Sequence, residues 1–423
     1  MPIIIAIILL IGSIYTAMNI KNNQINNEPH DESSTIETNT SVSSESNVSK
    51  PTENEYDYKE LDEMRGIWIP FMSLDMKGTD YSESAFKSKF DNIVEQSKAY
   101  GLNTLVVHVR PYGDSLYPSE IFPWSHLLTG TQGNNPGFDP LAYMVEKTHA
   151  EGLEFHAWVN PLRIQSKETP SILAENNPYN QWRNDNDTSN DDYVVDFDNG
   201  KYYNPAYPQV QAKIISGIRE IVKNYKVDAV QFDDYFYPTQ DPSFDKVAYD
   251  KYCSKINNGA VALSLQEWRT NNINTLISGV YSAIKDENNK VKFGISPQCN
   301  IQNDINMCAD VYTWGSVSGY VDYLCPQVYV SFTHPTLTFD KSAKQWKDLV
   351  SNENVKLYYG LAVYKAGSDV DSGTWQGSSD ILKQQIEYGR SLDSDGFMLY
   401  SWDYMNTEQT KEEVNNVVKI LTK

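Results

Sequence analysis

The sequence of 423 residues predicts an α/β fold, a (β/α)8 barrel, within residues 61–423. From Arg65 onward, a short β-rich run, a loop and an amphipathic helical pattern follow one another eight times, which is typical of a parallel sheet with helices outside it. In six of these β-rich runs, apolar residues alternate with polar or aromatic ones, as the two faces of a barrel strand require. A doubly wound sheet is less favoured, because no glycine-rich phosphate-binding motif follows the first strand.

Eight strands are expected, each a short run rich in β-branched or aromatic residues. They lie at 65–69, 104–110, 154–160, 228–233, 292–296, 323–329, 357–363 and 396–402. Helical periodicity lies between them, at 84–100, 139–151, 208–225, 264–286, 340–350, 378–392 and 407–422. The helical pattern after the fifth strand, near 304–317, is short and less regular than the others.

The alternation within the strands predicts which side chains face the interior of the barrel. In the second strand, Leu105 and Val107 share one face, which leaves His108 and Arg110 on the other. Barrel enzymes build their active sites at the C-terminal ends of the strands, so the polar or aromatic residues near those ends form the predicted site. They are His108, Arg110, Trp158, Asn160, Asp233, Gln298, Gln327, Tyr329 and Trp402.

Three long loops are expected at the same end of the barrel, and loops of this length in a compact domain are usually functional. They span 111–137, 161–206 and 235–262. Aromatic residues are frequent in them, including Tyr112 and Tyr235. Aromatic rings stack on the apolar faces of sugars, while acidic and amide groups bind hydroxyls. The mouth of the barrel is therefore expected to bind a carbohydrate, with Trp158 and Trp402 as part of the stacking platform.

The first sixty residues differ in composition from the rest. Residues 1–20 contain a long uncharged apolar run, which predicts a signal peptide or an N-terminal membrane anchor. Residues 21–60 are rich in Ser, Thr, Asn and Glu, with almost no large apolar side chains, so they are expected to form a disordered tether. The protein is therefore expected to be extracellular or attached to the cell surface.

Composition excludes several classes of function. A net charge of −21 is incompatible with a general nucleic-acid-binding protein, which needs a basic surface. The four Cys show no CxxC spacing and the six His no HxH or HExxH motif, so neither a metal nor another cofactor is expected. A metal site formed by His108, His156 and Asp233 stays as a less favoured alternative.

The candidate catalytic residues are Asp233 and Asp234, which are adjacent at the end of the fourth strand. Two neighbouring carboxylates repel each other, so one is expected to stay protonated at neutral pH and to serve as a general acid. Glycoside hydrolysis normally uses a second carboxyl group across the scissile bond. Asp403 is the candidate at the end of the eighth strand, and the loop candidates are Asp114, Glu120 and Asp198. Alternatively, the Asp pair acts alone on a substrate whose own 2-acetamido group is the nucleophile.

The sequence leaves the roles of two arginines open. Arg110 and Arg163 are suited to pairing with carboxylates of a substrate. Arg110 has an alternative role, which is to neutralise the Asp pair.

Seven sequence blocks together resemble, in order, the bacterial family-10 glycosyl-hydrolase-like proteins. They are MRGIWI, NTLVVHVRPYGDSLYPS, FDPLAYMVEKTHAEGLEFHAWVNPLR, YYNPAYPQVQ, VDAVQFDDYFYP, FGISPQ and YLCPQVY. The resemblance covers roughly residues 62–420. It implies an exported (β/α)8 barrel with glycosidase activity, and peptidoglycan glycan strands as the substrate. The lipobox Cys of the lipoprotein members is missing from this sequence.

Two functions from different classes are compatible with these features. The first is an exported glycoside hydrolase that acts on N-acetylated cell-wall glycans. The second is a catalytically inactive barrel that binds glycans at the cell surface. An Asp pair at the interior of the barrel mouth favours the enzyme, because binding alone does not require it.

Overall fold

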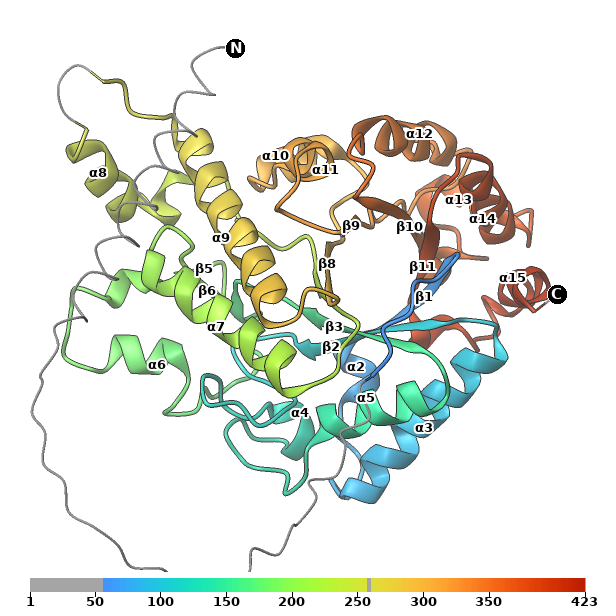
Figure 1. The fold of residues 1–423 in the computed structure, drawn as a ribbon, viewed down its shortest axis with the longest axis horizontal. Coiled ribbons are helices and arrows are strands. Elements are labelled where there is room, and N and C mark those ends of the chain that lie inside the picture. The colour runs from blue at the N-terminus through green and yellow to red at the C-terminus, as the bar shows by residue number, and fades with distance from the viewer. Residues whose placement is uncertain (1–55, 257–259, 423) are drawn as a thin grey trace, which may run out of the picture. The chain divides into compact units, whose positions relative to one another are not determined.

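The computed structural model describes residues 56–256 and 260–422, and it confirms the predicted barrel. Eight parallel strands form a closed ring, with the helices arranged around it (Figure 1). In order around the ring, the strands are β1 (Met64–Ile69), β11 (Gly396–Tyr400), β10 (Lys356–Ala362), β9 (Tyr323–Leu324), β8 (Lys292–Ile295), β7 (Ala229–Phe232), β3 (Glu154–Val159) and β2 (Thr104–Arg110). Each observed strand lies within one residue of its expected start, although β9 is much shorter than expected.

The long helices also lie close to their expected positions. They are α3 (Glu83–Ala99), α5 (Pro140–Ala150), α7 (Pro208–Asn224), α9 (Leu265–Glu287), α12 (Phe339–Leu349), α14 (Ile381–Ser391) and α15 (Lys411–Leu421). Local capping explains where several of them begin. The Ser82 hydroxyl accepts the N–H of Ala85 at the start of α3, and Ser264 forms a capping box with Glu267 on α9, which satisfies backbone donors at the helix ends.

The short helical pattern after β8 is divided into α10 (Ile301–Asn306) and α11 (Val311–Ser316). The remaining short helices lie in loops. They are α2 (Phe71–Leu74), α4 (His126–Thr129), α6 (Pro178–Arg183), α8 (Lys246–Ser254), α13 (Val370–Gly373) and the 3-10 turns η1 (Asp191–Tyr193), η2 (Pro242–Phe244), η3 (Val363–Lys365) and η4 (Trp402–Tyr404). In the long loop after β3, a small antiparallel sheet has the order β4 (Arg163–Gln165), β6 (Gly200–Tyr203) and β5 (Val194–Phe197).

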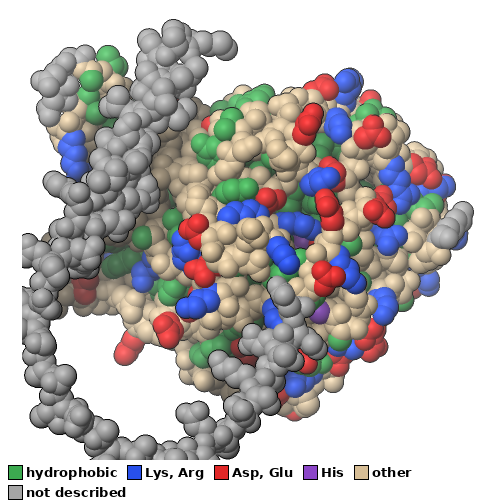
Figure 2. All heavy atoms as spheres, in the orientation of Figure 1, with side chains coloured by type: hydrophobic (Ala, Val, Ile, Leu, Met, Phe, Trp, Pro, Cys, Tyr) green, Lys and Arg blue, Asp and Glu red, His purple; other side chains and the backbone are tan. Residues whose placement is uncertain are grey.

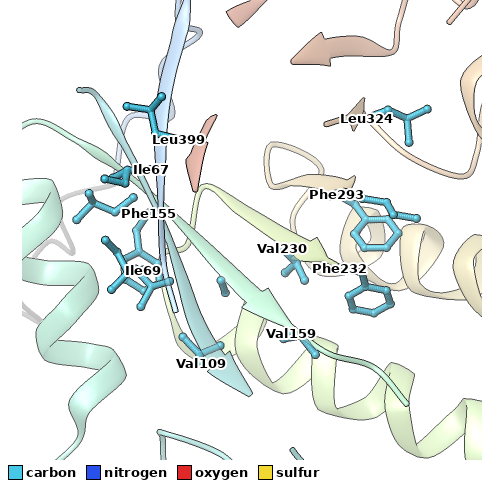
Figure 3. Packing of buried hydrophobic residues seen from close by; sticks show 14 of the residues in the cluster. Ile67, Ile69, Val109, Phe155, Val159, Val230, Phe232, Phe293, Leu324 and Leu399 are labelled. Atoms are coloured by element: carbon cyan, nitrogen blue, oxygen red, sulfur yellow. The ribbon is translucent and has the colours of Figure 1, made fainter. Parts of the chain in front are cut away.

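The two faces of the strands pack as the alternation predicts. Apolar residues of one face form the main core between strands and helices (Figure 3); they include Ile67, Ile69, Val109, Phe155, Val159, Val230, Phe232, Phe293, Leu324 and Leu399. The other face fills the barrel with a separate cluster of Met64, Trp68, Val106, Trp158, Ala229, Tyr323, Cys325, Tyr358 and Met398. Gly294 is required beside this cluster, because a Cβ there would lie 2.0 Å from the ring of Tyr323.

Acidic and basic side chains are interspersed over the face of the molecule shown in Figure 2. One example of such pairing joins α7 to α9, where Arg219 contacts Asp286 at 3.0 Å and Glu287 at 2.8 Å. Exposed pairs of this kind contribute at most about 1 kcal/mol each. The stability of the barrel therefore comes mainly from its two apolar layers.

The folded domain begins earlier than the expected boundary at residue 61. The Tyr56 hydroxyl donates to Asp228 at 2.8 Å, and its ring stacks on His149 with 3.9 Å between centroids. Tyr58 accepts a hydrogen bond from Asn288 Nδ2 at 2.9 Å. These two aromatic side chains attach residues 56–58 to the barrel, although the surrounding composition is polar.

The predicted signal or anchor at residues 1–20, and the predicted tether as far as residue 55, lie outside the described residues. In the part of the chain that the structure describes, no helix has both the length and the apolar character needed to cross a membrane.

Candidate active site

Asp233 and Asp234 follow β7 directly at the C-terminal mouth of the barrel. Asp233 continues the interior face of β7 and is 2% exposed, while Asp234 is 8% exposed. Their hydrogen bonds go to opposite sides of the mouth. Asp233 meets side chains of β3 and the residue after it, whereas Asp234 meets glutamines that follow β8 and β9. The pair is therefore held from both sides, each carboxyl by its own set of donors.

Asp233 is a buried carboxyl with few strong donors. Its Oδ2 accepts from Trp158 Nε1 at 3.1 Å and from Asn160 Nδ2 at 3.2 Å, and its Oδ1 accepts the N–H of Tyr235 at 3.4 Å. Burial raises the pKa of Asp233 to about 7; the charge of Asp234 adds to this effect, while Arg163 opposes it. A carboxyl with this pKa carries a proton in a large fraction of molecules at neutral pH, as a general acid requires.

Asp234 has an amide donor on each oxygen. Gln298 Nε2 donates to Oδ2 at 3.0 Å, and Gln327 Nε2 donates to Oδ1 at 2.9 Å. Gln298 and Gln327 are themselves joined by a parallel β-bridge that extends the barrel past β8 and β9. Burial raises the pKa of Asp234 above its ordinary value, although the two amide donors oppose this shift because they stabilise the ionised form. The hydrogen bonds therefore suit a carboxylate at Asp234.

Arg163, the first residue of β4, supplies positive charge to the site. Its guanidinium lies 5.2 Å from the ring centre of Tyr112 and 5.1 Å from that of Tyr235. Its backbone N–H donates to Asn160 Oδ1 at 3.0 Å, and its Nε donates to the carbonyl of Pro111 at 3.0 Å. Arg163 lowers the pKa of Asp233. Of the two candidate arginines, Arg163 is the one that lies at the mouth.

Arg110 does not face the mouth, which corrects the expected position of its side chain. The register of β2 shifts between His108 and Arg110, so Arg110 pairs with Val159, a residue of the helix-facing core. The guanidinium is 1% exposed and lies 4.5 Å from the ring centre of Phe122. A β-bulge of this kind reverses the face of the residue after it. Strict alternation in the sequence therefore assigned Arg110 to the wrong side.

His108 and Trp158 lie beneath the Asp pair. Their rings stack with 3.7 Å between centroids, and Trp158 is 7% exposed. Burial, together with Arg163 and Arg110, holds the pKa of His108 well below its ordinary value. His108 is therefore neutral. Trp158 orients Asp233 through its indole N–H, and its burial leaves no open ring face for the expected role as a sugar platform.

Aromatic rings lie on the other side of the mouth, near the ends of β9, β10 and β11. The ring centre of Tyr329 lies 5.6 Å from that of Tyr400 and 6.0 Å from that of Tyr364. Tyr404 lies 5.8 Å from Tyr364 and is partly exposed. Trp402 is half-buried in η4, next to this group. Tyr364 and Tyr404 were not expected at the site, because they lie neither on the interior face of a predicted strand nor in one of the three long loops.

The other candidate carboxylates differ from the pair in their hydrogen-bond partners or in their exposure. Asp403 accepts a hydrogen bond from the Ser73 hydroxyl at 2.7 Å, and buried Asp114 accepts from Gln132 Nε2 at 2.9 Å. Glu120 and Asp198 are exposed. Across residues 56–256 and 260–422, none of these four carboxylates shares a hydrogen-bond donor with Asp233 or Asp234. Of the candidate carboxyls, Asp233 and Asp234 are therefore the two that hydrogen-bond to residues at the ends of β3, β8 and β9.

The alternative metal site does not form. The two ring nitrogens of His156 face Tyr323 Oη and Glu154 Oε2, each at 3.1 Å, so His156 does not meet His108. Within the described chain, no group of three or more His, Cys, Asp or Glu side chains is arranged to hold a metal ion.

Sequence reasoning missed two residues of α10 that support the site. Asp304 is fully buried, and its Oδ1 accepts the N–H of Gln298 at 2.9 Å. Asn303 Nδ2 donates to Gln298 Oε1 at 2.8 Å. Burial raises the pKa of Asp304 to about 8. The irregular helical pattern after β8 did not indicate that α10 turns these two side chains towards Gln298.

The sequence matches the family described as Glycosyl hydrolase-like 10 over residues 63–376. It is 34% identical over 356 residues to "Glycosyl hydrolase YngK" of Bacillus subtilis (strain 168), covering 78% of this chain and 66% of YngK. It is 33% identical over 393 residues to "Glycosyl hydrolase DigH" of Escherichia coli (strain K12), covering 83% of this chain and 86% of DigH.

Solved structures share the fold at low sequence identity. The PgaB (BpsB) glycoside hydrolase domain from Bordetella bronchiseptica has a TM-score of 0.56 at 11% identity, covering 84% of this chain and 99% of that domain. The β-galactosidase from the psychrophilic Marinomonas ef1 has a TM-score of 0.53 at 9% identity, covering 84% of this chain and 58% of that enzyme. At these identities, the similarity concerns the barrel and not the substrate.

Proposed function

This chain belongs to the glycosyl hydrolase-like 10 family, and from that premise we propose that it cleaves N-acetylated cell-wall glycan strands with Asp233 and Asp234. The family membership agrees with the resemblance seen in the sequence and with the expected enzyme class, a glycoside hydrolase. One observation supports the catalytic assignment above all. Two adjacent buried carboxyls stand at the mouth of the barrel with different hydrogen-bond donors, so they differ in their preference for a proton.

The two carboxyls take different roles in this proposal. Asp233 is the general acid, because burial raises its pKa to about 7. Asp234 is the ionised partner, because both of its oxygens accept hydrogen bonds from amide groups. Environments that separate the protonation of two neighbouring carboxyls are how barrel and other glycosidases divide acid and base roles.

Asp304 is the further carboxyl that interacts with Asp234, but it is fully buried and bound to the backbone N–H of Gln298, which favours a substrate-assisted reaction. The acetamido oxygen of the substrate forms a bond to the anomeric carbon, while the bond to the leaving oxygen breaks. Asp233 gives its proton to the leaving oxygen, and Asp234 accepts a hydrogen bond from the acetamido N–H. Water then attacks the anomeric carbon and gives a proton to Asp233, while the bond between the anomeric carbon and the acetamido oxygen breaks and the acetamido group is regenerated. The two successive displacements give retention of configuration.

The remaining residues of the mouth suit the binding of a sugar chain. Tyr235 is 54% exposed beside Arg163, and Tyr404 is partly exposed on the opposite side. Exposed aromatic rings on two sides of a polar centre provide stacking surfaces for sugars on either side of the cleaved bond. Trp402 belongs to the same proposal as a binding residue.

Export is also part of the proposal. It is supported by the uncharged apolar run in residues 1–20, and an exported enzyme meets wall glycans directly. Cell fractionation of the full chain and of a chain that lacks residues 1–20 tests it. Recovery of the full chain in the cytoplasm would contradict export without affecting the assignment of the Asp pair.

The central test measures reducing ends released from purified wall glycans. Asp233→Asn and Asp234→Asn should each lower the rate at least about 100-fold, which is the lower end of what acid–base catalysis contributes. Asp198→Asn is the matched control, because Asp198 is exposed in the turn between β5 and β6. Full activity in both site variants would refute the assignment.

The same assay separates the two classes of function. Binding of wall glycans by the wild type without any release of reducing ends favours the inactive glycan-binding barrel. Equal rates on N-acetylated and de-N-acetylated strands would rule out substrate assistance, because the nucleophile of that mechanism is the acetamido group.

A further inference from the structure

Gln298 is held at three points, and two of them come from α10. Its backbone N–H donates to Asp304 Oδ1 at 2.9 Å, and its side-chain Oε1 accepts from Asn303 Nδ2 at 2.8 Å. Its Nε2 then donates to Asp234 Oδ2 at 3.0 Å. The Asn300 side chain caps α10 by accepting the N–H of Gln302 at 3.0 Å, so the position of Asn303 and Asp304 is set by the helix start.

The contact with Asn303 matches one of the two orientations of the Gln298 amide. A primary amide has a donor end and an acceptor end, and the NH2 group of Asn303 can only donate. Because Asn303 directs its NH2 group at Gln298, Gln298 presents its oxygen to Asn303 and its NH2 group to Asp234. An ionised carboxylate accepts hydrogen bonds on both oxygens and donates none, so this orientation fits ionised Asp234.

We propose that Asn303 is a positioning residue that supports the donor orientation of the Gln298 amide towards Asp234 and thereby favours the ionised form of Asp234. The role of ionised Asp234 in catalysis rests on the proposed function, whereas the orientation itself does not. Asn303 is exposed and uncharged, so it acts on Asp234 through Gln298 and not through charge or burial of its own.

Other groups also act on the protonation of Asp234. Gln327 is the second amide donor, and its Nε2 is held by the carbonyl of Ser296 at 3.1 Å. The titratable or charged groups that interact electrostatically with Asp234 are Asp233, Arg163, Asp304, Tyr235 and Tyr329. All of these residues are unchanged in the Asn303 variants, so a substitution at Asn303 alters only the contact with Gln298 and the local charge.

Asn303→Asp reverses the orientation, because a carboxylate at this position accepts and no longer donates. Gln298 then turns its NH2 group to residue 303 and its oxygen to Asp234. Loss of one hydrogen bond to a charged group should raise the pKa of Asp234 by about 1–2, or roughly 10- to 100-fold in its ionisation constant. Asn303→Ala removes the donor without adding charge and should give a smaller rise.

The control for added charge is Asn306→Asp on the same helix. Asn306 Oδ1 accepts a hydrogen bond from Gln302 Nε2 at 3.1 Å, and a carboxylate at this position can accept the same bond. A second control is Asn303→Asp in a Gln298→Met background, where no amide remains to be turned. Both should shift Asp234 by less than a third of the effect of Asn303→Asp alone.

The measurement is an NMR titration of the ¹³C-labelled Asp side-chain carboxyls in the full chain, with Asp234 assigned by its Asn variant. It needs no substrate, so its result is independent of whether the glycan substrate is correct. Equal shifts in Asn303→Asp and Asn306→Asp would overturn the positioning role, as would an unchanged Asp234 in Asn303→Asp. If the titration behaves as expected but no wall glycan is cleaved, the proposed function fails and the positioning role stands.

Discussion

Asp233→Asn should stabilise the protein at alkaline pH while it removes activity. The pKa of Asp233 is raised in the folded state from 3.8 to about 7, chiefly by burial. The folded protein therefore binds a proton at Asp233 more tightly than the unfolded chain does. The contribution of protonated Asp233 to the free energy of unfolding is fully present below about pH 4 and is lost as the pH rises through about 7. Asn carries no charge at any pH, so the variant does not lose this stability.

The structure sets the size of the effect. A pKa change from 3.8 to about 7 corresponds to about 4 kcal/mol between fully protonated and fully ionised Asp233. Between about pH 5 and about pH 8.5, the wild type should lose about 2.5 kcal/mol of this relative to Asp233→Asn. The hydrogen bonds from Trp158 and Asn160 to Oδ2 survive if the Asn oxygen takes that position, so the substitution itself should cost little.

Urea denaturation at the two pH values measures the difference, with Asp198→Asn as the control for an exposed carboxyl. The free energy of unfolding of Asp198→Asn should change with pH in parallel with the wild type. The reasoning is refuted if Asp233→Asn also changes in parallel with the wild type, because Asp233 would then be ionised already at about pH 5. An inactive variant that is more stable only at alkaline pH would support a site built at the expense of stability.

Three further predictions concern the surroundings of the pair and the fold. Trp158→Phe keeps an aromatic ring against His108 but removes the N–H that donates to Asp233. The fall of kcat/KM at alkaline pH, which reports the loss of the proton from Asp233, should therefore move up in pH by about 1. An unchanged alkaline fall would contradict the role of Trp158. A chain of residues 61–423 should fold but have a free energy of unfolding about 1–2 kcal/mol below that of 56–423 in urea, because the Tyr56–Asp228 hydrogen bond is lost; equal stability would show that Tyr56 contributes nothing. Gly294→Ala should cost about 3 kcal/mol in the same assay, because its Cβ would lie 2.0 Å from the ring of Tyr323, whereas Gly279→Ala, whose Cβ meets only the end of the Ile215 side chain, is the tolerated comparison.

Local pattern determined most of the fold. The positions of the strands and long helices followed from periodicity, because side-chain alternation and helical periodicity depend only on neighbouring residues. The same alternation put Asp233, Asn160 and Gln327 at the mouth. The structure adds a capping box of Ser264 and Glu267 at the start of α9.

The side-chain face predicted from the alternation was wrong where the backbone departs from a regular strand. Arg110 follows a β-bulge in β2 and turns to the helix-facing core. Trp158 is on the expected face, but the ring of His108 covers it, so its polar atom serves Asp233. Neither a bulge nor the depth of a side chain within the barrel leaves a periodic signal in the sequence.

What the sequence by itself determined is therefore the barrel, the family, and the place of the Asp pair at its mouth. Only the tertiary structure decided how the two carboxyls differ. The amides of Gln298 and Gln327 reach Asp234 from 64 and 93 residues away, and Trp158 reaches Asp233 from 75 residues away. These contacts depend on the register in which eight strands close into a ring. That register is set by the packing of all the strands and helices together, and no single segment encodes it.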